Sequence, residues 1–562
     1  MEINKLRYDI GTFSTKTGTP VYKSTPATVG KFNTQLLVSV LLGLGIFFRL
    51  FHFLDNRSLW TDEIYLATSL INKGFIELAT TPLYYEQKAP IGFLWLVRLA
   101  VVLFGKGEMA LRLIPFLAGI AALFLFVPVA RFFLKPLGVV MALALLALAP
   151  PIVYHSVEIK QYGTELLITI GALYLYTIYS KKNDYGSLLG WGLWGAVLLW
   201  FSYTAIFVLA GMAIGLSLYY IFNKDQVSFF RYVIPFALWL ISFIINYFLF
   251  TAKHADASWL VTFFAHYNGF MPLPPTSVTD LNWFIQAAHK MLFDPLGLLW
   301  NVTTIENIVL RESLKMPLLP MVFLAIGLLY FFRKNKRNFL ILLLPVILHL
   351  VASGLKLYPF MERFILFAAP LLILFIAAGC QKIISYSAVA GNWRFALPVL
   401  LLVVPTIRSV AQVADPDLFG GYKKSTQREG LLYINEQYQP GDAVYVYWNA
   451  SHAYKFYKNA HNLKYDAIAG QDVRFRSKST DDYFKNLAPD ITRLTGKKRV
   501  WVIYNNQQDI DIGDIITQIP AWYSAEVKGG HKLREAIGKF GKEVSIYNTQ
   551  DTNVSLFNLS SE

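Results

Sequence analysis

The chain is dominated by a recurring pattern in which a long apolar segment ends at a small group of basic residues. About twenty apolar residues cross the hydrocarbon core of a bilayer as a helix, and segments of this kind recur from residue 36 to residue 413. Hydrophobic residues make up 55% of the 562 residues, and a soluble protein of this size would not carry so many long apolar runs. The pattern predicts an all-α polytopic membrane domain with about eleven transmembrane helices.

The basic groups give these predicted helices a direction, because cytoplasmic loops carry an excess of lysine and arginine. The segment Pro90–Gly105 is short and carries Arg98, so we place it in the membrane interface. With that choice, residues 1–35 form a cytoplasmic tail and the C-terminal region lies outside a plasma or inner membrane. The groups that then fall on the cytoplasmic side are Arg131 and Lys135, Lys181 and Lys182, Lys224, Arg333–Arg337, Lys382, and Arg394.

The predicted membrane domain, residues 36–413, has two long outer loops, residues 55–110 and 251–316. Residues 414–562 turn polar and alternate between helical and extended patterns, which predicts a small soluble α/β domain outside the membrane. Its predicted elements are a helix over Thr426–Tyr438, a strand over Ala443–Tyr447, a helix over Ser451–Asn459 and a strand over Val500–Tyr504. This region lacks the glycine-rich phosphate loops of nucleotide-binding proteins, so we expect no nucleotide.

The net charge of +15 does not indicate a nucleic-acid partner, because its densest groups follow apolar segments, where cytoplasmic loops require them. Ionisable residues within or beside the predicted spans all lie toward the outer ends of those spans. A secondary transporter would keep charges near the bilayer midplane. The pattern favours a reaction at the outer surface, and the residues concerned are Arg49, His52, Glu165, His349, Lys356, Glu362, Arg363 and Arg408.

The first outer loop carries two adjacent carboxylates, Asp62 and Glu63, and a cation, Lys88, close to the predicted membrane surface. A carboxylate with an ordinary pKa of about 4 is ionised at neutral pH and can accept a hydroxyl proton. A cation in a water-poor site favours a departing anion. Two simpler interpretations stay open: Asp62 only caps the helix predicted over Glu63–Lys73, or Lys88 only extends toward the membrane interface.

Several segments in order resemble the GT-C membrane glycosyltransferases, the group that includes protein O-mannosyltransferases, lipid A aminoarabinose transferases and RgtA/B/C/D-like enzymes. The resemblance covers the predicted spans in sequence, and an outer α/β domain follows in many members. The segments that carry it are Phe48-Arg49-Leu50, Ser58-Leu59-Trp60-Thr61-Asp62-Glu63, Tyr85-Glu86-Gln87-Lys88-Ala89-Pro90, Leu111-Arg112-Leu113-Ile114-Pro115, Glu158-Ile159-Lys160-Gln161-Tyr162 and Tyr358-Pro359-Phe360-Met361-Glu362-Arg363.

The resemblance implies transfer of a sugar from a polyprenyl-phosphate carrier to a lipid, glycan or protein acceptor on the outer face, usually with inversion. It makes Asp62 the essential acid, gives Lys88 the lipid phosphate and places Glu158 near the acceptor. One position departs from the family: Lys160 stands where members often carry arginine, and lysine lacks the planar two-point contact.

From the residues themselves, the candidates for acid–base work are Asp62 and Glu63, and the resemblance adds Glu158. For the donor phosphate they are Lys88, then Arg363 and Lys356, with Tyr358 beside them. Glu158 can also form a structural bridge to Lys160 or Lys356. A carrier with a single phosphate requires no divalent metal, although a bound metal is compatible with this chemistry. Two alternatives to an enzyme stay open, a lipid-linked glycan flippase or exporter and a non-catalytic glycan-binding membrane protein.

Overall fold

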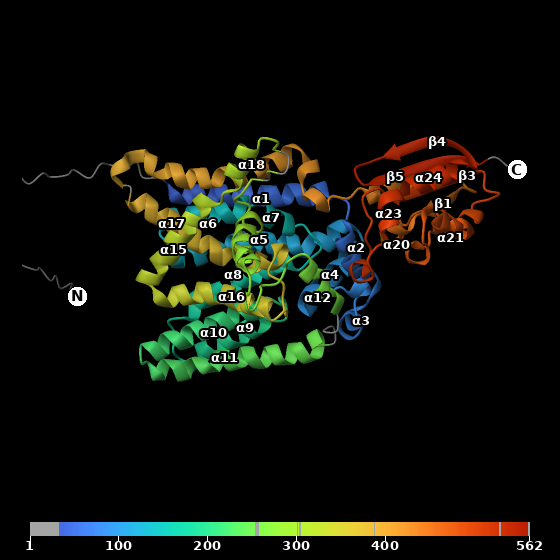
Figure 1. Cartoon of the computed structure of the whole chain (residues 1–562). Coiled ribbons are helices and arrows are strands. Elements are labelled where there is room, and N and C mark those ends of the chain that lie inside the picture. Colours follow the sequence, from blue (N-terminus) through green and yellow to red (C-terminus); the bar gives the residue numbers. More distant parts are fainter. Residues whose placement is uncertain are drawn as a thin grey trace, which may run out of the picture.

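A computed structural model of the chain describes residues 33–252, 258–300, 302, 305–386, 388–527 and 530–559. Most of the predicted cytoplasmic tail, residues 1–32, lies outside this part. Figure 1 shows a large helical bundle with a smaller α/β region at one end. The bundle helices are α1 (Thr34–Asp55), α5 (Glu108–Phe133), α6 (Pro136–Leu148), α7 (Pro150–His155), α8 (Tyr162–Tyr179), α9 (Tyr185–Leu198), α10 (Ala205–Phe222), α11 (Gln226–Asn246), α15 (Leu318–Lys334), α16 (Lys336–Gly354), α17 (Ala369–Tyr386) and α18 (Ala396–Ala414).

The helical membrane domain followed by a small sheet region is confirmed, and eight helices among the described residues are long and apolar enough to span a bilayer. Three predicted spans fall instead on α6, with 13 residues, α8, with 18, and α9, with 14. The count of eleven therefore stays a prediction. The eight are Thr34–Asp55, Glu108–Phe133, Ala205–Phe222, Gln226–Thr251, Ile308–Lys334, Lys336–Gly354, Glu362–Tyr386 and Gly391–Ala414.

The buried Arg49 of α1 holds the break between α6 and α7. In a continuous helix, the carbonyls of Leu146 and Ala147 would accept hydrogen bonds from residues 150 and 151, but both are prolines and carry no N–H. The guanidinium of Arg49 donates to these two carbonyls instead, at 3.2 Å and 3.4 Å. The arginine therefore compensates for two lost backbone donors and fixes α1 against this kink.

The first outer loop folds into α2 (Thr61–Asn72), α3 (Phe75–Thr80), the 3-10 turn η1 (Tyr84–Glu86) and α4 (Ile91–Phe104). With 14 residues, α4 is shorter than the eight membrane-length helices. Its mid-helix Arg98 donates to the carbonyls of Leu70 and Ile71, at 2.9 Å and 3.2 Å, in the last turn of α2. Carbonyls in a last turn lack intrahelical partners, so Arg98 joins the two helices.

The second outer loop contains α12 (Ser258–His266), α13 (Val278–Phe293) and α14 (Ile308–Lys315). The start of α13 is a capping box, in which the Ser277 hydroxyl accepts from the Asp280 N–H and the Asp280 carboxylate accepts from the Ser277 N–H. Short turns complete the outer segments: η2 (Tyr247–Thr251), η4 (Glu362–Ala368), η6 (Pro416–Leu418) and η7 (Gly421–Lys423). A further turn, η5 (Ala388–Phe395), connects α17 to α18 at the other end of the bundle.

The α/β region has a five-stranded sheet in the order β2-β1-β3-β5-β4. Strands β1 to β3 are parallel, whereas β5 pairs antiparallel with β3 and β4. The central β1 and β3 are buried on both faces, which explains their uninterrupted apolar runs. The elements are α19 (Gln427–Gln437), β1 (Ala443–Val446), η8 (Trp448–Ala450), α20 (Ser451–His461), β2 (Ile468–Ala469), η9 (Arg474–Arg476), α21 (Thr480–Thr492), β3 (Arg499–Asn505), α22 (Asp514–Thr517), α23 (Ala521–Glu526), α24 (His531–Gly538), β4 (Gly541–Asn548) and β5 (Thr552–Leu559).

The α/β region and the first outer loop share one hydrophobic core. Leu59, Ile64 and Leu70 belong to the same buried cluster as Phe456 and Trp501. Figure 1 shows α2 and α3 beside this region, beyond the end of the bundle. The shared core therefore fixes the α/β region over the loop that carries the predicted acids.

Polar contacts reinforce this placement. Arg428 of α19 donates to the Asn56 carbonyl and to a carboxylate oxygen of Glu108, both at 2.8 Å. The Tyr457 hydroxyl of α20 accepts from the Leu59 N–H at 2.8 Å. Glu108 is also 3.1 Å from a ring nitrogen of His461. These contacts attach α19 and α20 to both sides of the first outer loop.

Candidate functional site

The carboxylate of Asp62 lies between two cations from distant parts of the chain. Lys160 donates to Oδ1 at 2.9 Å, and the Arg363 guanidinium lies 2.9 Å from Oδ2. Burial favours the neutral acid, but Lys160 and then Arg363 outweigh it, so the pKa of Asp62 is lowered. Asp62 is therefore an ionised carboxylate, about one-fifth exposed, at the centre of the predicted site.

Asp62 does not cap its helix. The helix begins at Thr61, its cap position is Trp60, and that cap carries no side-chain hydrogen bond. Asp62 therefore occupies the second helical position, and its side chain points to the cations. The interpretation of Asp62 as a helix cap alone is wrong for this geometry.

Glu63, which the sequence offered as a second acid, has a different environment. Its carboxylate is fully buried and pairs with Arg57 at 2.9 Å and Arg112 at 3.3 Å. It also accepts a hydrogen bond from the Ile159 N–H at 2.9 Å. Because Ile159 lies between Glu158 and Lys160, this bond fixes the segment that brings Lys160 to Asp62. The geometry gives Glu63 a positioning role.

Glu158 is buried, and its Oε2 lies 2.6 Å from Nδ1 of His155. Its other oxygen, Oε1, is buried with no hydrogen-bond partner among the described residues. The suggested structural bridge from Glu158 to Lys160 is not formed, since Lys160 pairs with Asp62. A buried acceptor without a donor is costly and indicates a place where a ligand hydroxyl can donate.

The loop that contains Lys88 approaches the site through a strained turn. Tyr85 and Glu86 have positive φ values of 55° and 50°, which non-glycine residues rarely adopt. Strain of this kind persists where the surroundings enforce it, commonly at functional sites. Directly after the turn, Gln87 accepts from Lys160 at 2.6 Å, and the half-buried Lys88 follows. The loop thus brings Lys88 to the region around Lys160.

The segment after α16 supplies Arg363 and Tyr358 but turns Lys356 outward. Arg363 lies over the Trp60 ring, at 5.7 Å from its centroid. The Tyr358 hydroxyl is buried without a hydrogen-bond partner in the described ranges. Lys356 is exposed at a left-handed turn, with φ of 58°. Its predicted contact with the phosphate stays a prediction that the geometry does not favour.

Side chains of the α/β region contact α2 next to the site. The Tyr65 hydroxyl donates to Asp511 at 3.0 Å, and the same carboxylate is 3.1 Å from His452 Nε2. Tyr85 packs against Tyr65, with ring centroids 4.7 Å apart. Burial alone would raise the pKa of Asp511, but the contact with His452 lowers it. The strained turn of the Lys88 loop is therefore held against α2 by the α/β region.

Several residues at the site received no role from the sequence: Arg57, Arg112, Gln87, Tyr154 and Lys423. Arg112 had a usable signal, since a lone arginine near the start of an apolar helix requires a buried partner. For the other four residues, the sequence carries no signal that distinguishes them from their neighbours. Only the fold brings them together.

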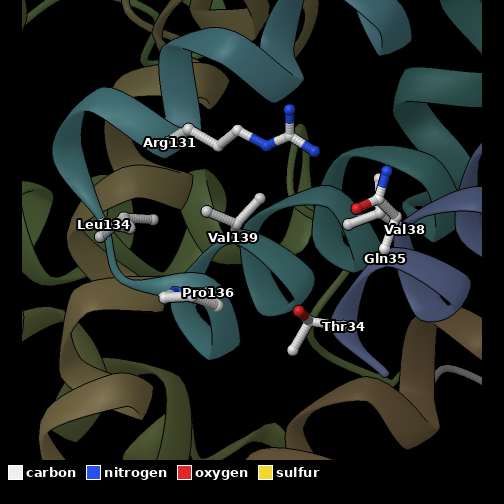
Figure 2. Close-up of a pocket in the computed structure, with 7 residues that line it drawn as sticks. All are labelled: Thr34, Gln35, Val38, Arg131, Leu134, Pro136 and Val139. Carbon is white, nitrogen blue, oxygen red and sulfur yellow. The ribbon is translucent and has the colours of Figure 1, made fainter. Parts of the chain in front are cut away.

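A separate pocket lies at the opposite end of the bundle. It has a volume of about 370 Å³ and is lined where the start of α1 meets the turn between α5 and α6, by Thr34, Gln35, Val38, Arg131, Leu134, Pro136 and Val139 (Figure 2). The 22 residues of α1 separate it from the site by roughly 33 Å. Within the described ranges, no group of three or more His, Cys, Asp or Glu is placed to hold a metal ion.

Residues 88–250 match the family model for dolichyl-phosphate-mannose-protein mannosyltransferases. ArnT from Cupriavidus metallidurans in the apo state aligns with a TM-score of 0.50 at 13% identity, covering 93% of this chain and 97% of that one. The oligosaccharyltransferase of Archaeoglobus fulgidus with zinc and sulfate aligns with a TM-score of 0.48 at 14% identity, covering 93% and 73%. No curated protein sequence matches. The expected resemblance to GT-C glycosyltransferases is confirmed by the family match and, at the level of fold, by ArnT.

Proposed function

We propose that this protein is a membrane glycosyltransferase that moves a sugar from a polyprenyl-phosphate carrier to an acceptor hydroxyl. The single observation that carries the proposal is the Asp62 carboxylate, held between Lys160 and Arg363 beneath the α/β region. The match of residues 88–250 to the model of dolichyl-phosphate-mannose-protein mannosyltransferases supports a polyprenyl-phosphate carrier. The outer face of the membrane is the proposed side of reaction.

The proposed reaction forms one bond and breaks one. The acceptor oxygen attacks the anomeric carbon, the bond from that carbon to the phosphate oxygen breaks, and the phosphate leaves with the electron pair. Asp62 takes the proton of the acceptor hydroxyl. Attack from the side opposite the phosphate inverts the anomeric carbon.

The ion pairs explain how a carboxylate with a lowered pKa can act as a base. While Lys160 and Arg363 both face Asp62, the carboxylate is ionised but attracts protons weakly. A donor phosphate near Arg363 would share that positive charge and raise the proton affinity of Asp62. Donor binding would thus activate the base for the acceptor.

The other candidates divide between the two substrates. Lys88, Arg363 and Tyr358 are proposed to contact the donor phosphate, since cationic and hydroxyl donors stabilise its growing negative charge. The unpaired Glu158 Oε1 is proposed to accept a hydroxyl of the sugar or the acceptor. These assignments require no metal ion for a carrier with one phosphate.

Native mass spectrometry of the purified protein tests the proposal. We expect an adduct with the mass of a polyprenyl-phosphate sugar, which converts to the polyprenyl phosphate when the acceptor is added. A lipid-linked glycan that binds but is never cleaved would favour a flippase or exporter. A protein that binds free glycan but no polyprenyl phosphate would favour a non-catalytic glycan-binding role.

A further inference from the structure

The connector between α18 and α19, residues 415–425, is folded against the site. Phe419 is buried and stacks on His52 of α1, with ring centroids 3.6 Å apart and planes within 4°. Gly420 follows with φ of +87°, and a side chain there would meet the Tyr154 ring at 3.0 Å. The glycine permits both the turn and the close approach. Lys423 is thereby directed inward.

Lys423 is a buried cation among aromatic rings. It is only 5% exposed, and its ammonium lies 4.9 Å from the Tyr154 centroid, 5.7 Å from that of Trp60 and 5.6 Å from that of Tyr422. No described residue forms an ion pair or a hydrogen bond with this ammonium. The adjacent Lys424, by contrast, pairs with Asp417. A buried ammonium requires a partner, and ring faces supply only part of that stabilisation.

One further donor near Lys423 lacks an acceptor. The Trp60 Nε1 is buried without a hydrogen-bond partner in the described part of the chain. The same indole ring lies near the guanidinium of Arg363, also at 5.7 Å. Two cations and one unpaired N–H therefore lie around the Trp60 ring. Oxygens of an anionic group could accept from Lys423 and from the Trp60 N–H, and would share Arg363 with Asp62.

Lys423 lies near the Trp60 ring, two residues from Asp62, and it also acts on the charge of Glu158. Burial would raise the pKa of Glu158, but His155, Lys423 and Arg363 together hold it well below its usual range. Lys423 and Arg363 thus act on the same carboxylate from two separate segments. The connector is part of the site rather than only a link to the α/β region.

We propose that Lys423 binds the phosphate of the polyprenyl-phosphate donor, together with Arg363 and the Trp60 N–H. This inference rests on the proposed function and adds a donor-binding residue supplied by the connector. It also links donor binding to the α/β region, because the connector leads directly into α19.

The test measures binding of undecaprenyl phosphate to the full-length protein in nanodiscs, by native mass spectrometry over a range of lipid concentrations. We expect Lys423→Met to weaken binding by about ten- to a hundred-fold, the loss typical of one charge-assisted contact. Lys423→Arg should stay within about three-fold of wild type, because it keeps the charge. The matched control is Lys424→Met, which removes the adjacent charge and should bind as wild type does.

A second arm adds inorganic phosphate to separate the lipid headgroup from a free anion. Competition with the lipid that disappears in Lys423→Met supports a shared phosphate position. Phosphate binding that depends on Lys423 but leaves lipid binding unchanged would overturn the assignment to the donor. If Lys423→Met does not fold, Lys423→Gln, which also lacks the charge, should show the same loss.

Two results separate this inference from the proposed function. Wild-type protein that binds undecaprenyl phosphate no differently from Lys423→Met overturns the role of Lys423 alone. Wild-type protein that binds none of the lipid overturns both proposals.

Discussion

A substitution at Asp62 can distinguish a catalytic role of its carboxylate from a structural one. Asparagine has nearly the same shape and can still accept from Lys160, but it cannot take a proton. We expect Asp62→Asn to lower the transfer rate by about a hundred-fold or more, while undecaprenyl phosphate binding stays near that of wild type. The measurement is the transfer rate with saturating donor. Full transfer by a folded Asp62→Asn protein would exclude Asp62 as the base.

The lowered pKa of Asp62 also predicts a pH profile. A depressed carboxyl pKa keeps the group ionised as the pH falls, and the midpoint of its protonation lies below the ordinary value of 3.8. At limiting donor, where the rate reports the free enzyme, transfer should therefore show no loss from Asp62 protonation between about pH 8 and pH 5. A pH–rate profile of the wild type checks this. A midpoint above about pH 5 that vanishes in Asp62→Asn would contradict the ion-paired state described here.

Unlike Asp62, Glu63 is expected to affect the stability of the protein more than its transfer rate. Glu63→Gln removes the charge that compensates the buried Arg57 and Arg112, and breaking such a pair typically costs about 3–5 kcal/mol. We expect a clear drop in melting temperature of the purified protein. Glu535→Gln, at an exposed pair with Lys532, is the control and should change stability by less than about 1 kcal/mol. Equal melting temperatures for the two variants would remove the positioning role.

At the scale of elements, much of the fold follows from local physics. The apolar lengths of α1, α5 and α10 predict spans, and the prediction of the helix now seen as α19 and of the strand β3 agrees with the structure to within about one residue at each end. Strands β4 and β5 were not predicted, because Val544 and Ile546 of the edge strand β4 lie on its exposed side and β5 gains its burial from β3. Pairing across the chain, not local pattern, makes them strands.

The site divides in the same way. Asp62 and Lys88 could be predicted from the sequence because charged residues next to the predicted membrane surface are costly and rare. The pairing of Lys160 with Asp62, and the inward turn of Lys423, depend on segments that meet only in the folded chain. A sequence shows which residue types a site contains, whereas the partners of each charge depend on tertiary packing.

The contact between α1 and the α6–α7 break gives a prediction at the scale of elements. Arg49→Met leaves the Leu146 and Ala147 carbonyls without donors, and we expect a loss of about 2–4 kcal/mol of stability from two unsatisfied buried acceptors. The readout is the melting temperature in detergent. Arg131→Met removes an exposed arginine at the other end of the bundle and should have little effect. If both variants melt alike, the prolines have another source of compensation.

At the scale of the whole molecule, the basic groups gather at the end of the bundle opposite the site. The ammonium of Lys181 lies 5.9 Å from the Phe132 ring centroid, beside Arg131. Arg337 donates to the Ser180 carbonyl, and the Lys135 N–H donates to Gln381 at 2.7 Å, next to Lys382. Four basic groups that the sequence assigns to one side of the membrane therefore lie close together in the folded chain. Such an excess is characteristic of a cytoplasmic surface.

This arrangement predicts the orientation of the protein in its membrane. Cys380 is the only cysteine in the chain, so Cys380→Ala provides a background without thiols. In that background, Lys542→Cys on the exposed side of β4 should react with a membrane-impermeant maleimide in intact cells or spheroplasts. Lys334→Cys, at the end of α15, should react only after permeabilisation. The reverse pattern would place Asp62 on the cytoplasmic side, since the site and the α/β region share one end of the bundle, and transfer at the outer face would then be excluded.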